Sequence, residues 1–259
     1  MEGRKFGWIR DPKDPKDRMM AAHHPVITRD LPEETDLTGD FPEIFDQGQE
    51  GSCVWNATVA VEMFCQEKQA SKTIEMMSRN FGYYMTRAKE GTCKEDVGCC
   101  IRNAMWIAAH FGIPHESTWP YNPDTLFTLP SFKAFREAKQ HQSLEYFRVD
   151  WTDLKEVMGC LADGWPIVFG MSIYESFESA TTQKSGVVPV PNTSSEKSYG
   201  GHCMVIVGYK WVGEELFFKV RNSWGDKWGQ AGHCWIPAQI ITSPVLSDDF
   251  WTIRKIEIG

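Results

Sequence analysis

The sequence predicts an α+β protein with two lobes, and three observations support this. The 259 residues are enough for one large domain or for two small ones that share a cleft. Segments with helical periodicity occupy the chain from residue 53 to residue 162. Segments rich in Val, Ile, Phe and Trp follow, separated by Gly, Pro and Asn, which is typical of antiparallel strands. Helices followed by strands indicate the α+β class.

The predicted helices begin at Cys53. Ser52 precedes this residue as an N-cap, and the apolar side chains that follow fall on one helix face: Ala57, Ala60, Val61 and Phe64. Further helices are predicted at about Ser78–Lys89, Ile101–His110, Ser131–His141 and Thr152–Ala162. Gly112 and Pro114 end the helix at Ile101–His110, because neither residue favours its continuation.

The predicted strands follow in the second half of the chain, at Trp165–Ile173, Cys203–Tyr209, Glu215–Arg221 and His233–Ile236. A long loop, Glu178–Gly200, with Gly, Pro and a Ser/Thr stretch, lies between the first two. At the other end, residues 1–30 form a polar N-terminal strap that carries three apolar side chains, Phe6, Trp8 and Ile9.

Charge and hydropathy exclude two classes of partner. The chain has 27 basic and 35 acidic residues, a net charge of −8, and no Lys/Arg block, so nucleic acid is not an expected partner. The longest apolar runs, such as Cys203–Val207, are far shorter than the roughly 20 residues that span a bilayer, so no membrane association is expected. No apolar segment follows the basic start, so a cytoplasmic location is expected.

The eight cysteines show neither a CxxC pair nor a regular framework. Adjacent Cys99 and Cys100 could bond to each other only with strain. Reduced thiols are therefore expected, as is usual in the cytosol. Cys93, Cys99 and Cys100 lack zinc-ligand spacing, and the His23-His24 doublet is better explained as a solvated feature, so no metal site is predicted.

Three residue types that are needed for nucleophilic acyl transfer occur in suggestive settings. Cys53 stands at a helix N-terminus, where unpaired N–H groups favour a thiolate. His202 follows two glycines and opens an apolar strand, and Asn222 could hold its imidazole in one orientation. Each residue alone would be read as structural. Together they supply a nucleophile, a base and a residue that orients the base.

Around these residues the chain resembles the papain-like (C1 family) cysteine peptidases, over about Leu31 to Ile236. His202 lies about 150 residues after Cys53, within the range seen in that family. The segments that carry the resemblance are Gln47-Gly48, Gly51-Ser52-Cys53-Val54-Trp55-Asn56-Ala57, Gly201-His202 with Val205-Ile206-Val207-Gly208-Tyr209, and Asn222-Ser223-Trp224-Gly225 with Trp228-Gly229.

The resemblance implies a role for each matching residue. Cys53 is the expected nucleophile, His202 the general base and then acid, and Asn222 the residue that orients the imidazole. Gln47 would donate its amide to the oxyanion, together with the Cys53 backbone N–H. Two tryptophans complete the site: Trp224 would shield the bond between His202 and Asn222, and Trp228 would line the leaving-group side or pack in the core.

The resemblance also implies the fold and the reaction. A helical lobe at about 53–141 and an antiparallel β-barrel lobe at about 143–259 would enclose the cleft, within a peptidase domain of residues 31–259. The implied reaction is hydrolysis of peptide or protein substrates through a thioester acyl-enzyme, without metal or cofactor. A proteinaceous cysteine-protease inhibitor is a candidate partner. The alternatives are an acyl or amide transferase with the same triad and a non-catalytic binding module.

The segments Glu116-Ser117, Tyr174-Glu175-Ser176-Phe177 and Ser185-Gly186-Val187 resemble microbial or viral relatives more than lysosomal cathepsins. The chain also departs from the family pattern. Glu50 stands where many secreted members have a disulfide cysteine, and the glycine pair expected near Cys99-Cys100 is missing. Residues 1–30 are too few for the long inhibitory propeptide of many relatives. The strap is predicted to brace the back of the β lobe, and the alternative is a plug across the cleft.

Overall fold

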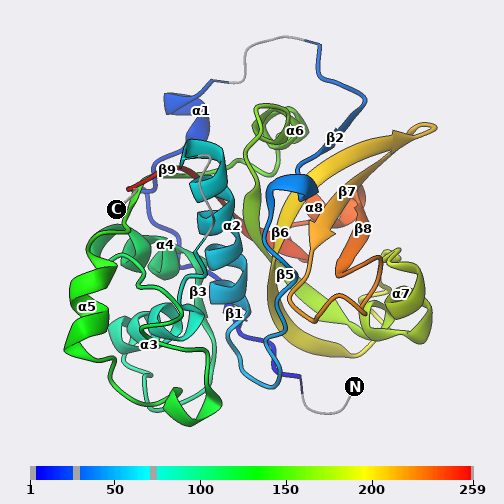
Figure 1. The fold of residues 1–259 in the computed structure, drawn as a ribbon. Coiled ribbons are helices and arrows are strands. Elements are labelled where there is room, and N and C mark those ends of the chain that lie inside the picture. The colour runs from blue at the N-terminus through cyan, green and yellow to red at the C-terminus, as the bar shows by residue number, and fades with distance from the viewer. Residues whose placement is uncertain (1–3, 26–29, 71–74, 258–259) are drawn as a thin grey trace.

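The helices between residues 79 and 138 gather on one side of the molecule, and most of the antiparallel sheet lies on the other, with the helices between residues 154 and 241 beside it (Figure 1). The computed structural model describes residues 4–25, 30–70 and 75–257. The helices are α1 (Met20–His23), α2 (Cys53–Ala70), α3 (Arg79–Glu90), α4 (Ile101–His110), α5 (Phe132–Ala138), α6 (Leu154–Ala162), α7 (Ala180–Ser185) and α8 (Ala238–Ile241). The strands are β1 (Trp8–Ile9), β2 (Glu34–Asp36), β3 (Cys99–Cys100), β4 (Ser143–Arg148), β5 (Ile167–Tyr174), β6 (Ser198–Val212), β7 (Glu215–Arg221), β8 (His233–Pro237) and β9 (Ser247–Ile256).

Helix α2 begins at Cys53, as predicted, and lies in the centre of the molecule. It packs against α3 and α4 on one side and against β6 and β9 on the other, so its residues from Cys53 to Cys65 are all buried. The single apolar face expected from the sequence therefore understates its burial. The Ser52 carbonyl accepts bonds from the N–H groups of Trp55 and Asn56, which fixes the start of the helix.

The other predicted helices are confirmed to within two or three residues at each end. Helix α3 begins after Ser78, whose hydroxyl accepts from the Phe81 N–H at 3.1 Å, and ends at Gly91, which adopts a φ of 79°. Ser131 and Asp153 cap α5 and α6 in the same way, so each helix starts one or two residues later than predicted. The predicted loop Glu178–Gly200 contains one short helix, α7.

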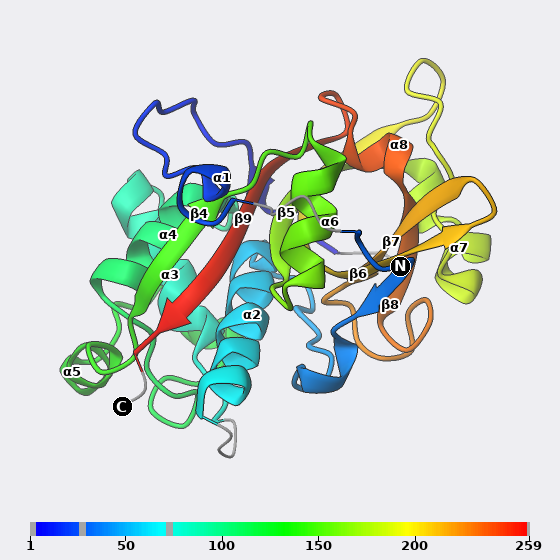
Figure 2. The ribbon, with the colours of Figure 1, turned by 90° about the horizontal axis from the view of Figure 1, so that it is seen from above.

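The antiparallel sheet follows the order β4-β9-β5-β6-β7-β8, with β2 added beside β6. Within the described residues its ends, β4 and β8, do not pair, so the prediction of a β-barrel is wrong and the sheet is open. The reason lies in the packing. Strands β4 and β9 lie against α4 on the helical side, far from β8 (Figure 2). Because β4 packs against α4, it cannot also pair with β8 to close a barrel.

The register of the strands determines where His202 and Asn222, the two predicted catalytic residues of the sheet, lie relative to each other. On β6, His202 pairs with Met171 of β5, and Val205 pairs with Arg221, the last residue of β7. Asn222 therefore follows directly after a strand that neighbours His202. The two side chains meet at the edge of the sheet that faces the N-terminus of α2.

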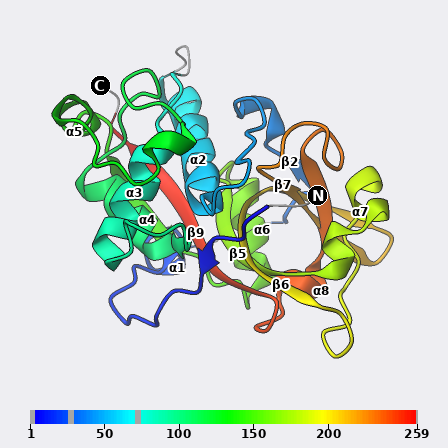
Figure 3. The ribbon, with the colours of Figure 1, turned by 90° about the horizontal axis from the view of Figure 1, so that it is seen from below.

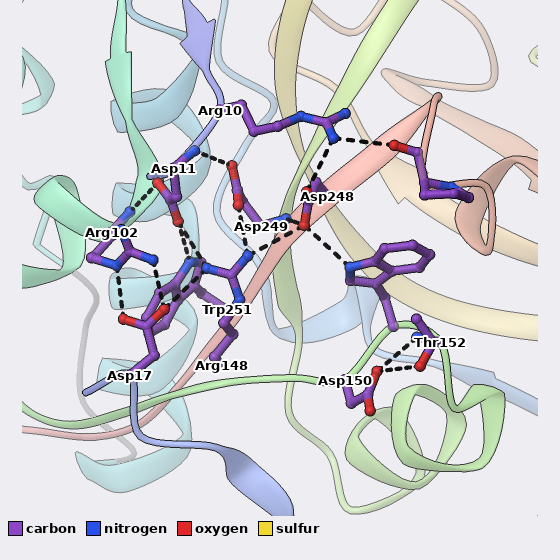
Figure 4. Close-up of polar contacts among 12 residues, drawn as sticks. Arg10, Asp11, Asp17, Arg102, Arg148, Asp150, Thr152, Asp248, Asp249 and Trp251 are labelled. Carbon is purple, nitrogen blue, oxygen red and sulfur yellow. Dashed lines mark hydrogen bonds and ion pairs between the residues drawn. The ribbon is translucent and has the colours of Figure 1, made fainter. Parts of the chain in front are cut away.

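The N-terminal strap crosses between the helical side and the sheet (Figure 3). Its strand β1 pairs in parallel with β3 of the helical side. A polar network ties the next residues to β9 (Figure 4). There the Asp11 N–H donates to Asp249 Oδ2 at 2.7 Å, and Arg148 pairs with both carboxylates. Arg102 of α4 pairs with Asp17 at 2.6 Å, so the strap is bound to both sides.

Two further features concern the expectations about compartment and membrane. All eight cysteines are free thiols in the structure. No helix in the described part of the chain is both long enough and apolar enough to cross a bilayer.

Candidate active site

Cys53 is fully buried at the N-terminus of α2. Burial raises the pKa of its thiol to about 11, although backbone groups of Cys203 and Gly7 lie close enough to lower it in part. The sequence led us to expect that the helix N-terminus would favour a thiolate. In this structure burial outweighs that effect, and the sulfur is protonated at neutral pH.

His202 and Asn222 form a buried hydrogen bond of 2.8 Å between imidazole Nε2 and amide Oδ1. The same Oδ1 accepts from the Ser223 N–H at 2.8 Å, which identifies it as the oxygen of the amide. Nε2 of His202 therefore carries the proton, and Nδ1 of the neutral ring has a free lone pair. Nδ1 has no hydrogen-bond partner among the described residues. Burial lowers the pKa of His202 to about 4, so the ring is neutral.

The two predicted tryptophans lie beside this pair, and both are buried. The Trp224 ring stacks on His202 with centroids 4.9 Å apart and an interplanar angle of 30°. It thus covers one face of the imidazole, and its role as a shield stays a prediction. Trp228 packs against Trp224 and, nearly parallel, against Phe177, at 5.4 Å in each case. Trp228 is therefore part of a core, and its role beside a leaving group stays a prediction.

Gln47 is buried and linked to the residue that follows Asn222. Its Oε1 accepts from the Ser223 hydroxyl at 2.7 Å, and its backbone N–H donates to the Ser223 carbonyl at 3.0 Å. Its amide Nε2 donates to the Glu50 carbonyl at 2.8 Å and to the Lys5 carbonyl of the strap at 3.2 Å. Ser223, which sequence analysis did not single out, therefore holds both Gln47 and Asn222 in place.

No group of three or more His, Cys, Asp or Glu side chains in the described structure is arranged to hold a metal ion. The site thus consists of the Cys53 thiol and the His202 imidazole, which is hydrogen-bonded to Asn222. The side-chain amide of Gln47 and the ring of Trp224 lie beside them. A family model described as papain family cysteine protease matches residues 31–245. The chain belongs to this family.

Similar proteins agree with this membership. A peptidase C1-like protein of Acanthamoeba polyphaga mimivirus is 32% identical over an aligned length of 276 residues. The alignment covers 98% of this chain and 88% of that protein. Xylellain, a cysteine protease from Xylella fastidiosa, is 32% identical with a TM-score of 0.87, and the match covers 97% of this chain and 96% of that one. A Carica candamarcensis cysteine protease in complex with E-64 shares the fold at 18% identity, with a TM-score of 0.64. The match covers 87% of this chain and 99% of that one.

In this papain-family protease, strap residues Arg4–Trp8, here called the cleft segment, lie over the predicted catalytic residues. The Phe6 ring meets the rings of His202 and Trp224 edge-on, with centroids 6.1 Å away in both cases. Gly7 lies against Gly51, and its carbonyl accepts from the Cys99 N–H at 2.8 Å. The prediction that the strap braces the back of the β lobe is therefore wrong for these residues.

The cleft segment fits because glycines of the protease leave room for it. A Cβ on Gly170 would lie 2.0 Å from the Trp8 indole, and one on Gly201 would lie 2.4 Å from the Trp8 carbonyl. At the far end of this space the indole N–H of Trp8 donates to Asp249 at 3.0 Å. Phe6 and Trp8 are apolar residues on a polar segment, which predicts that they pack against another part of the protein. No local pattern indicates which surface they pack against, and in the structure Trp8 is buried and Phe6 partly buried.

Proposed function

We propose that this cysteine protease hydrolyses peptide bonds through Cys53, His202 and Asn222, with a thioester acyl-enzyme as the intermediate. His202 takes the thiol proton at Nδ1, and the sulfur attacks the substrate carbonyl carbon. Protonated His202 then returns the proton to the leaving amine, and a water attacks the thioester with His202 again as base. The observation that supports this most is the Nε2 bond to Asn222, which leaves the Nδ1 lone pair for this task.

Gln47 has the geometry of an oxyanion donor. Its amide Nε2 already donates to a carbonyl oxygen, that of Lys5 in the cleft segment. A substrate carbonyl in the same position would receive this bond and the Cys53 backbone N–H as negative charge develops on oxygen. Loss of one such donor typically costs about 100-fold or more in turnover.

The cleft segment holds the protease in a closed state. The Lys5 carbonyl occupies the Gln47 amide, Gly7 lies at Cys53, and Phe6 lies on His202. A substrate therefore needs this segment to leave before it can approach the sulfur. In this closed state burial raises the pKa of the thiol to about 11 and lowers that of the imidazole to about 4, so both groups are uncharged. The thiolate is the reactive form, so the closed state lacks it.

The test uses a full-length variant in which the segment is dislodged. Gly7→Ala places a Cβ 1.8 Å from the Gly51 carbonyl oxygen, so the segment cannot stay as it is. Gly7→Ala should cleave an internally quenched peptide library faster than wild type, and E-64 should stop it. Gly7→Ala/Cys53→Ala should be inactive. Cleavage that persists in this double variant, or none in Gly7→Ala despite fast alkylation of Cys53, would refute the proposal.

A further inference from the structure

The side chain of Arg4 in the cleft segment rests in a set of groups suited to a guanidinium. Its Nη1 donates to Asp46 Oδ1 at 3.0 Å, and its Nη2 donates to the Trp224 carbonyl at 3.3 Å. Its Cζ lies 5.2 Å from the centroid of the Trp224 ring. A carboxylate, a carbonyl and an aromatic face therefore meet one cation, and only 16% of the arginine side chain stays exposed.

These groups are held in place by the body of the protein. Asp46 Oδ1 also accepts from the Gly48 N–H at 2.9 Å, which fixes the carboxylate. Asp46 forms an antiparallel bridge with Trp224, and the Gly225 N–H donates to the Phe45 carbonyl at 3.0 Å. The acceptors are thus set by bonds that do not involve the cleft segment. The Asp46 side chain is about half exposed with Arg4 in place. When the segment leaves, a preformed cation site remains.

The site lies next to the predicted catalytic residues. Trp224, whose carbonyl and ring bind the cation, stacks on His202, and Asp46 directly precedes Gln47. Trp224 also packs on Trp228, the residue that family resemblance assigns to the leaving-group side. A substrate whose carbonyl accepts a hydrogen bond from the Gln47 amide would therefore place the residues after its scissile bond beside Asp46.

We propose that Asp46 and Trp224 form a recognition subsite for an arginine side chain of the substrate, one or two residues after the scissile bond. This proposal rests on the proposed function and names a substrate class for it. Arginine is favoured over lysine because two separate guanidinium nitrogens reach two acceptors while the planar group faces the indole. In the closed state Arg4 occupies the subsite, as a substrate arginine would in the open state.

The test measures kcat/KM for internally quenched peptides cleaved by full-length Gly7→Ala. Matched peptides carry arginine, lysine or citrulline, a neutral isostere of arginine, at the first or second position after the scissile bond. We expect arginine to be preferred over citrulline by about tenfold at one of these positions, as for a charge-assisted hydrogen bond at a half-exposed site. The preference should shrink as salt is added.

The second arm adds Asp46→Asn to Gly7→Ala. Asparagine keeps an oxygen for the Gly48 N–H but removes the charge, so the ratio of arginine to citrulline should fall to about one. Glu178→Gln is the control, because burial raises the pKa of the Glu178 carboxyl and the charge of Arg4 acts to lower it. This variant should keep the ratio of arginine to citrulline cleavage. A ratio near one in Gly7→Ala, or a ratio lost in Glu178→Gln and kept in Asp46→Asn, would overturn the subsite. Either result would leave the peptidase proposal intact, since all these peptides would still be cleaved.

Discussion

Gly7→Ala should expose Cys53 to alkylation, because the steric conflict that it creates is between two backbones. The added Cβ would lie 1.8 Å from the carbonyl oxygen and 2.5 Å from the carbonyl carbon of Gly51. Ordinary contact begins roughly 1.6 Å farther out, and no rotamer can relieve a clash that involves Cβ and a main-chain oxygen. Gly51 directly precedes Ser52 at the start of α2, so the strap is the part that yields.

The size of the effect follows from the cost of overpacking, about 1–3 kcal/mol. At about 2 kcal/mol the open population rises by roughly 30-fold, since each 1.4 kcal/mol is a factor of ten. Cys53 is fully buried in the closed state, so its alkylation rate follows the open population. We therefore expect iodoacetamide to label Cys53 about 30 times faster in Gly7→Ala than in wild type.

The assay is quenched alkylation followed by peptide mass spectrometry. Cys93, which is partly exposed, serves as the internal reference because its rate should not change. Gly39→Ala is the matched glycine control, since a Cβ there meets nothing within 4 Å. Phe6→Ala, which removes the ring from His202, should also accelerate labelling. An unchanged Cys53 rate in both strap variants, with both proteins folded, would refute closure by the cleft segment.

Three further predictions concern turnover, pH and thiols. In the Gly7→Ala background, Asn222→Ala should lower turnover less than Cys53→Ala, because the nucleophile and the oxyanion donors survive, and equal losses in peptide cleavage would contradict this. Burial raises the pKa of Glu62 to about 7, so the folded state binds this proton more tightly than the unfolded state. Between pH 8 and 6.5 it should add about 1 kcal/mol of stability as pH falls, and urea unfolding of Glu62→Gln should lack that increment. Thiol titration of denatured, unreduced protein should find all eight cysteines free, and recovery of fewer would contradict the proposed cytoplasmic location.

The sequence was most informative where local signals and tertiary packing agree. The predicted helices α3 and α4 are both present with most of their apolar residues buried; Ser78 caps the start of α3, whereas no side chain caps the start of α4. Strand β9 was not among the predicted strands, and its polar residues Asp248, Asp249 and Arg254 stand among apolar ones such as Phe250 and Trp251. Asp249 is buried there because Trp8 and Asp11, more than 200 residues earlier, donate hydrogen bonds to it and Arg148 pairs with it. No local pattern contains that pairing.

The predicted site shows the same limit. Motif residues pointed to Cys53, His202 and Asn222, because the segments around each of them resemble those of the papain-like family. The position of the cleft segment depends instead on complementarity between Trp8 and two glycines, Gly170 and Gly201, which lie on different strands. A glycine in sequence shows only that a side chain is absent. It does not say which distant segment fills the space.

The charge state of the predicted catalytic pair depends on that same segment. A helix N-terminus favours a thiolate at Cys53, yet the buried thiol has a pKa of about 11 and the buried His202 a pKa of about 4. Both shifts come first from burial, so both should relax when the cleft segment leaves and water enters. Linkage makes the relation reciprocal: a charged thiolate–imidazolium pair must weaken docking of the segment by as much as docking disfavours the pair. Closure of the cleft and loss of the reactive ion pair are therefore two descriptions of one equilibrium.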